Sequence, residues 1–203
     1  RTLEAASREA DALILEFAPV TRRVIDAMSR CRIISVAAVG VDCVDVRAAS
    51  ERGIWVTNVP GYCAREVADH TMALLLACAR QVPALDRATR SPREAPWAGR
   101  WGGRWAATAP RPAVLWGKTL GLVGFGRTGR AVAERAAGFG MRVLASSPRT
   151  DVREMESRGV RAATLQEVAA SSDFVSLHCP VTPETRGMVN EGFLARMSSP
   201  VPG

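Results

Sequence analysis

The sequence has 203 residues, of which 47% are hydrophobic and 23% charged, which is typical of a globular protein and excludes a disordered or fibrous chain. It has no apolar stretch of roughly 18 residues, and its first ten residues lack the apolar core of a signal peptide, so we expect neither a membrane span nor a secretory signal. The net charge of +7 comes almost entirely from arginines that are spread along the chain. This spread favours a compositional bias over a nucleic-acid-binding or membrane-binding surface.

The cysteines predict a reduced, cytoplasmic protein. Five are present, they are widely spaced, and none forms a Cys-x-x-Cys pair, which argues against a disulfide framework or a zinc site. We expect each to be a small buried apolar residue: Cys31, Cys43, Cys63, Cys78 and Cys179.

The first ninety residues alternate short apolar runs with amphipathic stretches. We expect strands at 12–15, 33–36 and 54–57, and helices at 22–29, 44–52 and 64–79. Thr21 is the expected cap of the first of these helices, and most of the last one should be buried. This alternation predicts a parallel sheet with helices on both faces.

Residues 83–117 differ from the rest, with five prolines, four glycines and four of the five tryptophans. This density of proline blocks a long helix and predicts a linker between two α/β units. Trp97, Trp101 and Trp105 lie four residues apart with arginines between them, so the segment either stacks on nucleic acid or packs against a domain cleft. We favour packing, because no nucleic-acid-binding motif accompanies the tryptophans.

A second α/β alternation begins at Thr119. We expect strands at 119–123, 141–145 and 173–177, and helices at 127–139, 151–158, 165–170 and 190–197.

The clearest functional motif is Gly124-x-Gly126-x-x-Gly129, which follows an apolar strand and precedes an amphipathic helix. Gly124 allows a sharp turn, Gly126 lets a pyrophosphate approach the backbone, and Gly129 lets helix and strand pack closely. The N-terminus of the helix then offers free N–H groups and a partial positive charge to phosphates. The motif predicts a dinucleotide site, and the alternative is a glycine-rich turn without a ligand.

The end of the next strand bears on which dinucleotide would bind. Dinucleotide-binding units usually place an Asp or Glu there, about 20 residues after the glycines, to bind the ribose hydroxyls. Here residues 146–150 read SSPRT and contain no carboxylate. A carboxylate would repel a 2′-phosphate, whereas the hydroxyl of Ser147 and the guanidinium of Arg149 would bind it. We predict that NADP is accepted as well as NAD, or preferred to it; the alternative is a neutral loop that does not discriminate.

Longer motifs carry a family resemblance. VGVDCVDV (39–46), RGIWVTNVPGYCAREVADHTMALLL (52–76), TLGLVGFGRTGRAVAERAAGFGMRVLA (119–145) and SSDFVSLHCPVTPETRGMVN (171–190) occur in this order. They resemble the D-isomer-specific 2-hydroxyacid dehydrogenases, a family that includes phosphoglycerate dehydrogenases, glyoxylate/hydroxypyruvate reductases and the C-terminal-binding-protein corepressors.

The resemblance implies an α/β fold of two doubly wound parallel-sheet domains, flavodoxin-like and Rossmann, with the active site between them. We expect both to be incomplete: 1–82 would be part of the substrate domain, 83–117 a linker and 118–203 part of the NAD(P)-binding domain. The implied function is hydride transfer between NAD(P)H and a small 2-keto or 2-hydroxy acid. It also implies a homodimer at full length and no membrane or nucleic-acid partner.

Site residues follow from the same resemblance. Val39 and Gly40 match a loop whose backbone N–H groups hold the substrate carboxylate. Thr182 and Thr185 match residues that stabilise the loop after the last predicted strand. At Thr71 and Thr185 the alternative is a hydroxyl that bonds local backbone. The implied cofactor-binding residues are Thr71, Gly124, Phe125, Gly126, Arg127, Thr128, Gly129, Ser147, Arg149, Cys179, Pro180 and Thr185.

Departures from the family limit the expected activity. Ala37 and Ala38 alter the expected carboxylate pocket. The family's catalytic Arg, Glu and His follow the last matching motif and are absent here, while His70 and His178 match structural or cofactor positions. We therefore expect a chain truncated at both ends, with no catalytic residue of its own and little or no turnover. The alternatives are a non-enzymatic NAD(H)-sensing module like the corepressors and, less favoured, nucleic-acid binding through the linker.

Overall fold

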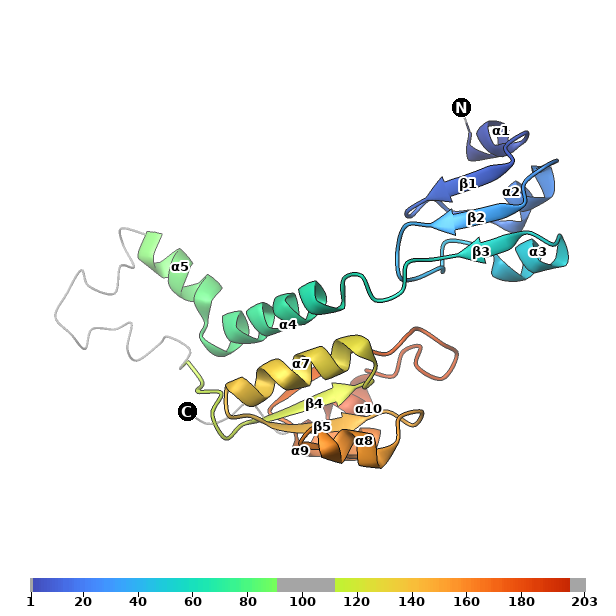
Figure 1. The fold of residues 1–203 in the computed structure, drawn as a ribbon. Coiled ribbons are helices and arrows are strands. Elements are labelled where there is room, and N and C mark those ends of the chain that lie inside the picture. Colours follow the sequence, from blue (N-terminus) through green and yellow to red (C-terminus); the bar gives the residue numbers. More distant parts are fainter. Residues whose placement is uncertain (1, 91–111, 198–203) are drawn as a thin grey trace. The chain divides into compact units, whose positions relative to one another are not determined.

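The computed structural model describes residues 2–90 and 112–197, which belong to two compact units, Arg1–Cys63 and Ala64–Gly203 (Figure 1). The tryptophans at 97, 101 and 105 lie outside the described residues. The division between the units precedes helix α4 (Ala64–Ala79), whereas the sequence predicted a boundary after residue 82. The reason is packing, because Ala68 and Met72 of this helix share a core with Leu122 of the second unit.

Unit 1 contains a parallel sheet in the order β1-β2-β3. Its strands are β1 (Ala12–Leu15), β2 (Ile33–Val36) and β3 (Trp55–Thr57), and its helices are α1 (Leu3–Ser7), α2 (Arg22–Ala27) and α3 (Val46–Glu51). The strands therefore lie side by side in the order in which they occur in the chain, and a helix joins each strand to the next.

Helices cover one face of this sheet, not both as predicted. Leu15, Ile34 and Val36 are buried in a core with α2 and α3, whereas Ile14 and Trp55 on the other face are 79% and 75% exposed. Successive side chains of a strand point to opposite faces, so the two sets separate cleanly. Crossovers of the same hand between successive neighbouring strands place α2 and α3 on the same side.

Unit 2 contains a parallel sheet in the order β6-β5-β4-β7. Its strands are β4 (Thr119–Val123), β5 (Arg142–Ser146), β6 (Val160–Ala162) and β7 (Phe174–Leu177). The chain starts in the middle at β4, moves outward to β6 and then returns to pair β7 with the free side of β4. This is the beginning of a Rossmann fold, with its switch point between β4 and β7.

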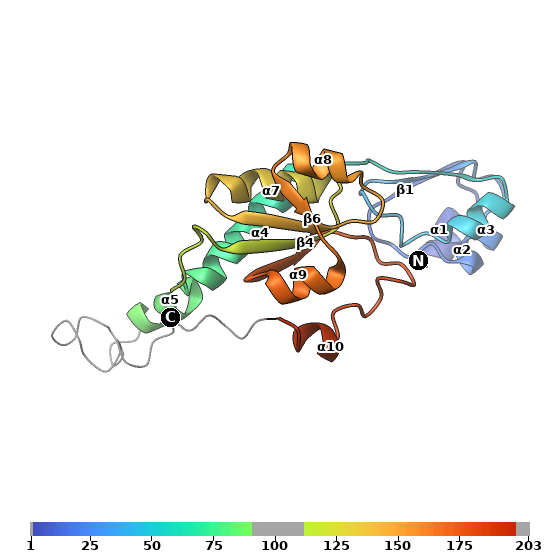
Figure 2. The same cartoon turned by 90° about the horizontal axis from the view of Figure 1, so that it is seen from below.

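Helices lie on both faces of the second sheet (Figure 2). Leu120 and Leu122 share a core with α7 and α8, whereas Val123 packs against α9. Gly121 lies where α9 approaches closely: a Cβ there would be 2.7 Å from Val168 Cγ1. Besides α4, the helices are α5 (Val82–Arg90), α7 (Arg127–Gly138), α8 (Val152–Ser157), α9 (Leu165–Ser171) and α10 (Glu191–Leu194).

Some local expectations were wrong. Helix α4 was expected to be mostly buried, but it buries only one stripe and leaves Leu74 56% exposed. Helix α5 forms despite Pro83, because proline is tolerated in the first turn, where the N–H has no intrahelical partner. The short strand β6 was not predicted, and α10 ends three residues before the predicted Met197. Thr21 precedes α2, but its side chain makes no capping bond.

In residues 2–90 and 112–197, no helix combines the length and apolar character needed to cross a membrane.

Candidate functional site

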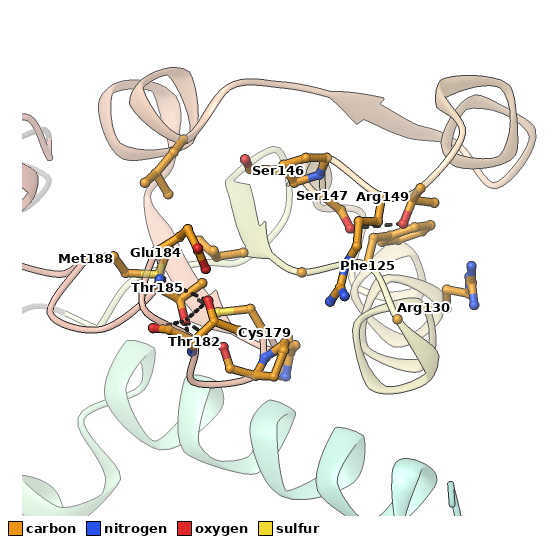
Figure 3. A pocket seen from close by; sticks show the side chains of 18 residues that line it. Phe125, Arg130, Ser146, Ser147, Arg149, Cys179, Thr182, Glu184, Thr185 and Met188 are labelled. Atoms are coloured by element: carbon orange, nitrogen blue, oxygen red, sulfur yellow. Dashed lines mark hydrogen bonds between the residues drawn. The ribbon is translucent and has the colours of Figure 1, made fainter. Parts of the chain in front are cut away.

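A pocket of about 630 Å³ lies at the carboxyl ends of β4, β5 and β7, and all of its lining belongs to unit 2 (Figure 3). This is the switch point of the sheet, where open parallel sheets bind their ligands. The lining residues are Val123, Gly124, Phe125, Gly126, Arg130, Ser146, Ser147, Pro148, Arg149, Thr150, Leu165, His178, Cys179, Pro180, Thr182, Glu184, Thr185 and Met188.

The glycine motif forms the tight turn between β4 and α7. Gly124 has a φ of +101°, and a Cβ there would lie 2.6 Å from the carbonyl oxygen of His178. A Cβ on Gly129 would overlap the carbonyl oxygen of Gly124. Both positions therefore require glycine, one for its backbone conformation and the close approach of the β7 loop, the other for the packing of helix on turn.

Gly126 plays a different part. It is the N-cap of α7 and has no side chain to cap it, and a Cβ built there would meet no atom within 4 Å. The first helical hydrogen bond is donated by Arg130 to the Gly126 carbonyl oxygen, so the N–H groups of Arg127, Thr128 and Gly129 precede the helical ladder. Open space in front of these amides and the positive end of a 12-residue helix suit an anion.

Arg130 lines the pocket, but its charge is already paired. Its Nη2 donates a hydrogen bond of 3.0 Å to Glu154 Oε2, and its guanidinium lies 5.8 Å from the centre of the buried Phe125 ring. The Arg130 Nε lies 2.9 Å from Glu154 Oε1, but its N–H is not aimed at that oxygen and makes no hydrogen bond within the described residues. Arg130 therefore acts mainly as a link between α7 and α8.

The loop after β5 presents hydroxyls and a guanidinium to the pocket. The Ser147 and Thr150 hydroxyl oxygens are 2.9 Å apart and share a hydrogen bond. Arg149 is exposed and makes no hydrogen bond or ion pair with the described residues. The nearest carboxylate in sequence, Asp151, accepts a hydrogen bond of 2.8 Å from the Arg153 N–H, as the cap of α8, and does not line the pocket.

The loop after β7 forms the opposite wall. The N–H of His178 donates to the Val123 carbonyl oxygen at 2.7 Å, and its ring Nε2 lies 3.0 Å from Ser176 Oγ. Burial lowers the pKa of His178 below its ordinary value, so the imidazole is neutral at pH 7. Cys179 follows, and its Sγ lies 3.9 Å from the sulfur of Met188.

Two threonines hold this wall in place. The Thr185 hydroxyl donates to the Pro180 carbonyl oxygen at 2.7 Å and accepts from the Thr182 N–H at 2.7 Å. Hydrogen bonds from the Thr182 hydroxyl and from its own backbone N–H lower the pKa of Glu184, which keeps that carboxyl ionised. The loop is thus ordered by its own side chains.

The structure brings together eight of the predicted cofactor-binding residues as pocket lining: Gly124, Phe125, Gly126, Ser147, Arg149, Cys179, Pro180 and Thr185. Arg127, Thr128 and Gly129 form the adjoining first turn of α7. Thr71 does not line the pocket; its hydroxyl donates to the Val67 carbonyl oxygen at 2.7 Å, which is the local backbone bond considered as its alternative role.

The predicted substrate-binding residues lie in unit 1, after β2. The carbonyl oxygen of Val39 accepts a hydrogen bond of 2.7 Å from Asn58 Nδ2, and a Cβ on Gly40 would lie 3.0 Å from Asp42 Oδ2. Sequence reasoning did not assign a role in the site to Arg130, Glu184 or Met188. The one usable signal was the spacing of Arg130, four residues after Gly126 on the helix.

The pocket fits a dinucleotide better than a metal. Within residues 2–90 and 112–197, no group of three or more His, Cys, Asp and Glu side chains could hold a metal ion. The open Gly126, the amides at the start of α7 and the hydroxyls after β5 are instead the features that bind phosphates and a ribose.

Comparisons with known proteins agree with this geometry. The family described as D-isomer specific 2-hydroxyacid dehydrogenase, NAD binding domain, matches residues 72–201. The chain is 43% identical to a glyoxylate reductase of Korarchaeum cryptofilum, with 94% of this chain and 55% of that protein covered. It is 40% identical to a hydroxypyruvate reductase of Thermotoga maritima, with 95% and 59% covered.

A solved structure of D-lactate dehydrogenase from Aquifex aeolicus, complexed with NAD and lactic acid, superposes with a TM-score of 0.83 at 27% identity. The match covers 96% of this chain and 55% of that one. The chain thus spans between half and two thirds of the length of these relatives. Because the family match extends over more than half of the chain, from α4 to beyond α10, the chain belongs to the D-isomer specific 2-hydroxyacid dehydrogenase family.

Proposed function

We propose that unit 2 binds a nicotinamide adenine dinucleotide, with the pyrophosphate at the N-terminus of α7. The observation that carries this proposal is the open space at Gly126, in front of the first-turn amides and at the switch point of the sheet. The loops after β5 and β7 supply the remaining walls. The family's description as an NAD binding domain, and the D-lactate dehydrogenase solved in complex with NAD, support the same ligand.

We further propose that the whole protein is an oxidoreductase that acts on a small 2-keto or 2-hydroxy acid, and that the 203 residues supply its coenzyme site. A bound nicotinamide supplies or accepts the hydride in such a reaction. Backbone N–H groups of the loop at Val39 and Gly40 would hold the carboxylate of the acid, since successive amides in a loop suit an anion. The reductases among the relatives support this substrate class. We also propose a cytoplasmic location, from the five free cysteines, and a homodimer, by analogy with the family alone.

The reaction also needs a residue that transfers a proton, and the candidates in this chain are its two histidines. His178 is held neutral by burial and lies beside Ser176, while His70 is exposed on α4. Within residues 2–90 and 112–197, neither histidine ring has a hydrogen-bonded carboxylate to orient it as a general acid or base. We therefore propose that the 203 residues bind the coenzyme and do not catalyse turnover. The comparisons give no support to the alternative of a corepressor-like module.

Coenzyme binding is tested by fluorescence titration of NADH and NADPH with the folded chain. We expect a saturable signal, and Gly126→Val should weaken it by about tenfold or more, because its side chain fills the space in front of the amides. Gly138→Ala, at the other end of α7, is the matched control, since a Cβ there also meets nothing. Absence of saturation in a protein with a native circular dichroism spectrum would overturn the proposal.

Turnover is tested separately with glyoxylate and hydroxypyruvate, by following the absorbance of NADH and NADPH. The expected result is no oxidation above the rate without protein. Steady-state turnover that is lost in Gly126→Val would show that the 203 residues contain their own proton donor, and would contradict the second part of the proposal.

A further inference from the structure

We infer that the ribose end of the pocket recognises a 2′-phosphate, so that the protein prefers NADPH to NADH. The inference rests on the proposed function, because it names the coenzyme that the same site selects. Three observations carry it: the charge of the loop after β5, the hydroxyl pair in that loop, and the unpaired state of its arginine.

The first observation is the absence of a carboxylate where NAD-binding units place one. Strand β5 ends at Ser146, and the next residue, Ser147, lines the pocket with a hydroxyl. An Asp or Glu at this point binds both ribose hydroxyls and repels a 2′-phosphate. Asp151 does not take over this role, because its carboxylate caps α8 and lies outside the pocket lining. The negative charge that excludes NADP is therefore absent from this wall.

The second observation is that the hydroxyls of Ser147 and Thr150 lie 2.9 Å apart. One of the two hydrogens is used in the bond between them, so the other remains free to donate. A phosphate oxygen, which only accepts hydrogen bonds, is the natural partner for such a donor. The Thr150 N–H donates to the Ser147 carbonyl oxygen at 3.0 Å, which closes the turn and holds the two hydroxyls on the same side.

The third observation is that only one of the two arginines of the pocket is paired with a carboxylate. Arg130 is neutralised by Glu154, whereas Arg149 has no hydrogen bond or ion pair to any described residue. Pro148 precedes Arg149, and its ring fixes its own backbone φ, which restricts the loop. An unpaired guanidinium beside a hydroxyl pair can bind a phosphate through two parallel hydrogen bonds.

The carboxylate that does line the pocket lies at the other end. Figure 3 shows Ser147 and Arg149 on one side of the pocket and Glu184 with Thr185 and Met188 on the opposite side. Glu184 is held ionised by Thr182, but it belongs to the loop after β7. The charge of the pocket is therefore divided, with its positive side at the ribose end.

Dissociation constants for NADPH and NADH, measured by titration calorimetry on the 203-residue chain, test the inference. We expect NADPH to bind about tenfold or more tightly, in line with one charge-assisted hydrogen bond pair. Arg149→Ala should weaken NADPH by about tenfold and leave NADH unchanged. Arg153→Ala removes the same charge from an exposed position on α8 outside the pocket, and should change neither constant.

Ser147→Asp is the complementary change and should invert the preference, because the new carboxylate repels the 2′-phosphate and accepts hydrogen bonds from ribose hydroxyls. A probe that needs no variant is competition by adenosine 2′,5′-bisphosphate against 5′-AMP, in which the bisphosphate should displace NADPH at the lower concentration. The advantage of NADPH over NADH should also shrink as salt is raised, since it is electrostatic.

The outcomes separate the two proposals. If NADH binds as tightly as NADPH or more tightly, the 2′-phosphate site is refuted while the dinucleotide site stands. If neither coenzyme binds to folded protein, both fail. If Arg149→Ala and Arg153→Ala weaken NADPH equally, the effect comes from overall charge, and the assignment to Arg149 is overturned.

Discussion

Both parallel sheets of this chain are built from strands joined by helices, but helices cover two faces of one sheet and only one face of the other. In unit 2 the central strand β4 is buried along its whole length, with α7 on one face and α9 on the other. In unit 1 the helices line one face of β1-β2-β3, and Ile14 and Trp55 on the other face are largely exposed.

Strand order explains the difference. In unit 2 the chain reverses direction across the sheet after β6, so later helices cross on the opposite face and a pocket opens between the diverging loops. In unit 1 the described strands proceed in one direction, so both crossover helices lie on one side. A reversal of strand order thus produces both the second layer and the candidate binding site.

The largest expected effect comes from the centre of the covered sheet. Leu122→Ala should lower the free energy of unfolding by about 2–5 kcal/mol, because its side chain is fully buried in β4. Ile14→Ala, on the uncovered face of unit 1, should stay within about 0.5 kcal/mol of the parent. Urea unfolding followed by circular dichroism measures both. Similar losses for the two variants would show that the exposed face of unit 1 is covered in solution.

The turn at the switch point should be nearly as sensitive. Gly124→Ala combines a positive φ with a Cβ that would meet the His178 backbone, so we expect a loss of about 3 kcal/mol or more together with loss of coenzyme binding. Gly53→Ala in unit 1 also has a positive φ, but its Cβ would meet nothing, so it should cost only about 1–2 kcal/mol. Equal costs would mean that the β7 loop does not hold this turn.

A smaller contrast is expected between two helix caps. Thr164 forms a capping box with Glu167 at the start of α9, so Thr164→Ala should cost about 1 kcal/mol. Thr21 precedes α2 but makes no capping bond, so Thr21→Ala should cost only a few tenths of a kcal/mol. Thermal unfolding of the two variants measures the loss of stability in each. A larger loss for Thr21→Ala than for Thr164→Ala would contradict this prediction.

The smallest effect concerns pH. Burial lowers the pKa of His178 in the folded chain, so below about pH 6.5 the unfolded chain takes up the proton first. Stability from this group is therefore complete above that pH and declines as the pH falls toward the folded-state pKa. His178→Asn should flatten the decline between pH 7 and 5, because it removes the titrating group. Unfolding free energies of the parent and of His178→Asn across that range check this, and parallel curves for the two proteins would contradict it.

Sequence alone predicted a large part of the fold. The bounds of β1, β2, α4 and β4 agree with the predictions to the residue, because each is a sustained apolar pattern between clear turn residues. β6 was missed because it has three residues and buries only the first of them, Val160. The single layer of helices in unit 1 could not be foreseen, since Ile14, Ile33 and Trp55 are apolar and resemble core residues in a linear pattern.

The candidate site, like the fold, could be predicted from the sequence only in part. The glycine turn was predictable because each glycine answers a local backbone requirement. The pairing of Arg130 on α7 with Glu154 on α8 depends on two helices that the sheet brings together, and the place of Glu184 across the pocket from Arg149 depends on two loops at the ends of its strands. No sequence spacing encodes such contacts. The distinction between a paired and an unpaired arginine, on which the coenzyme preference rests, therefore needed the structure.

Amide hydrogen exchange of the chain, with and without saturating NADPH, tests most directly whether the pyrophosphate binds at the start of α7. We expect slower exchange at Arg127, Thr128 and Gly129, whose N–H groups would bind the pyrophosphate, and no change in the loop at 39–41 of unit 1. Unchanged exchange across the start of α7, in a protein that nevertheless binds the coenzyme, would place the dinucleotide elsewhere and overturn the proposed site.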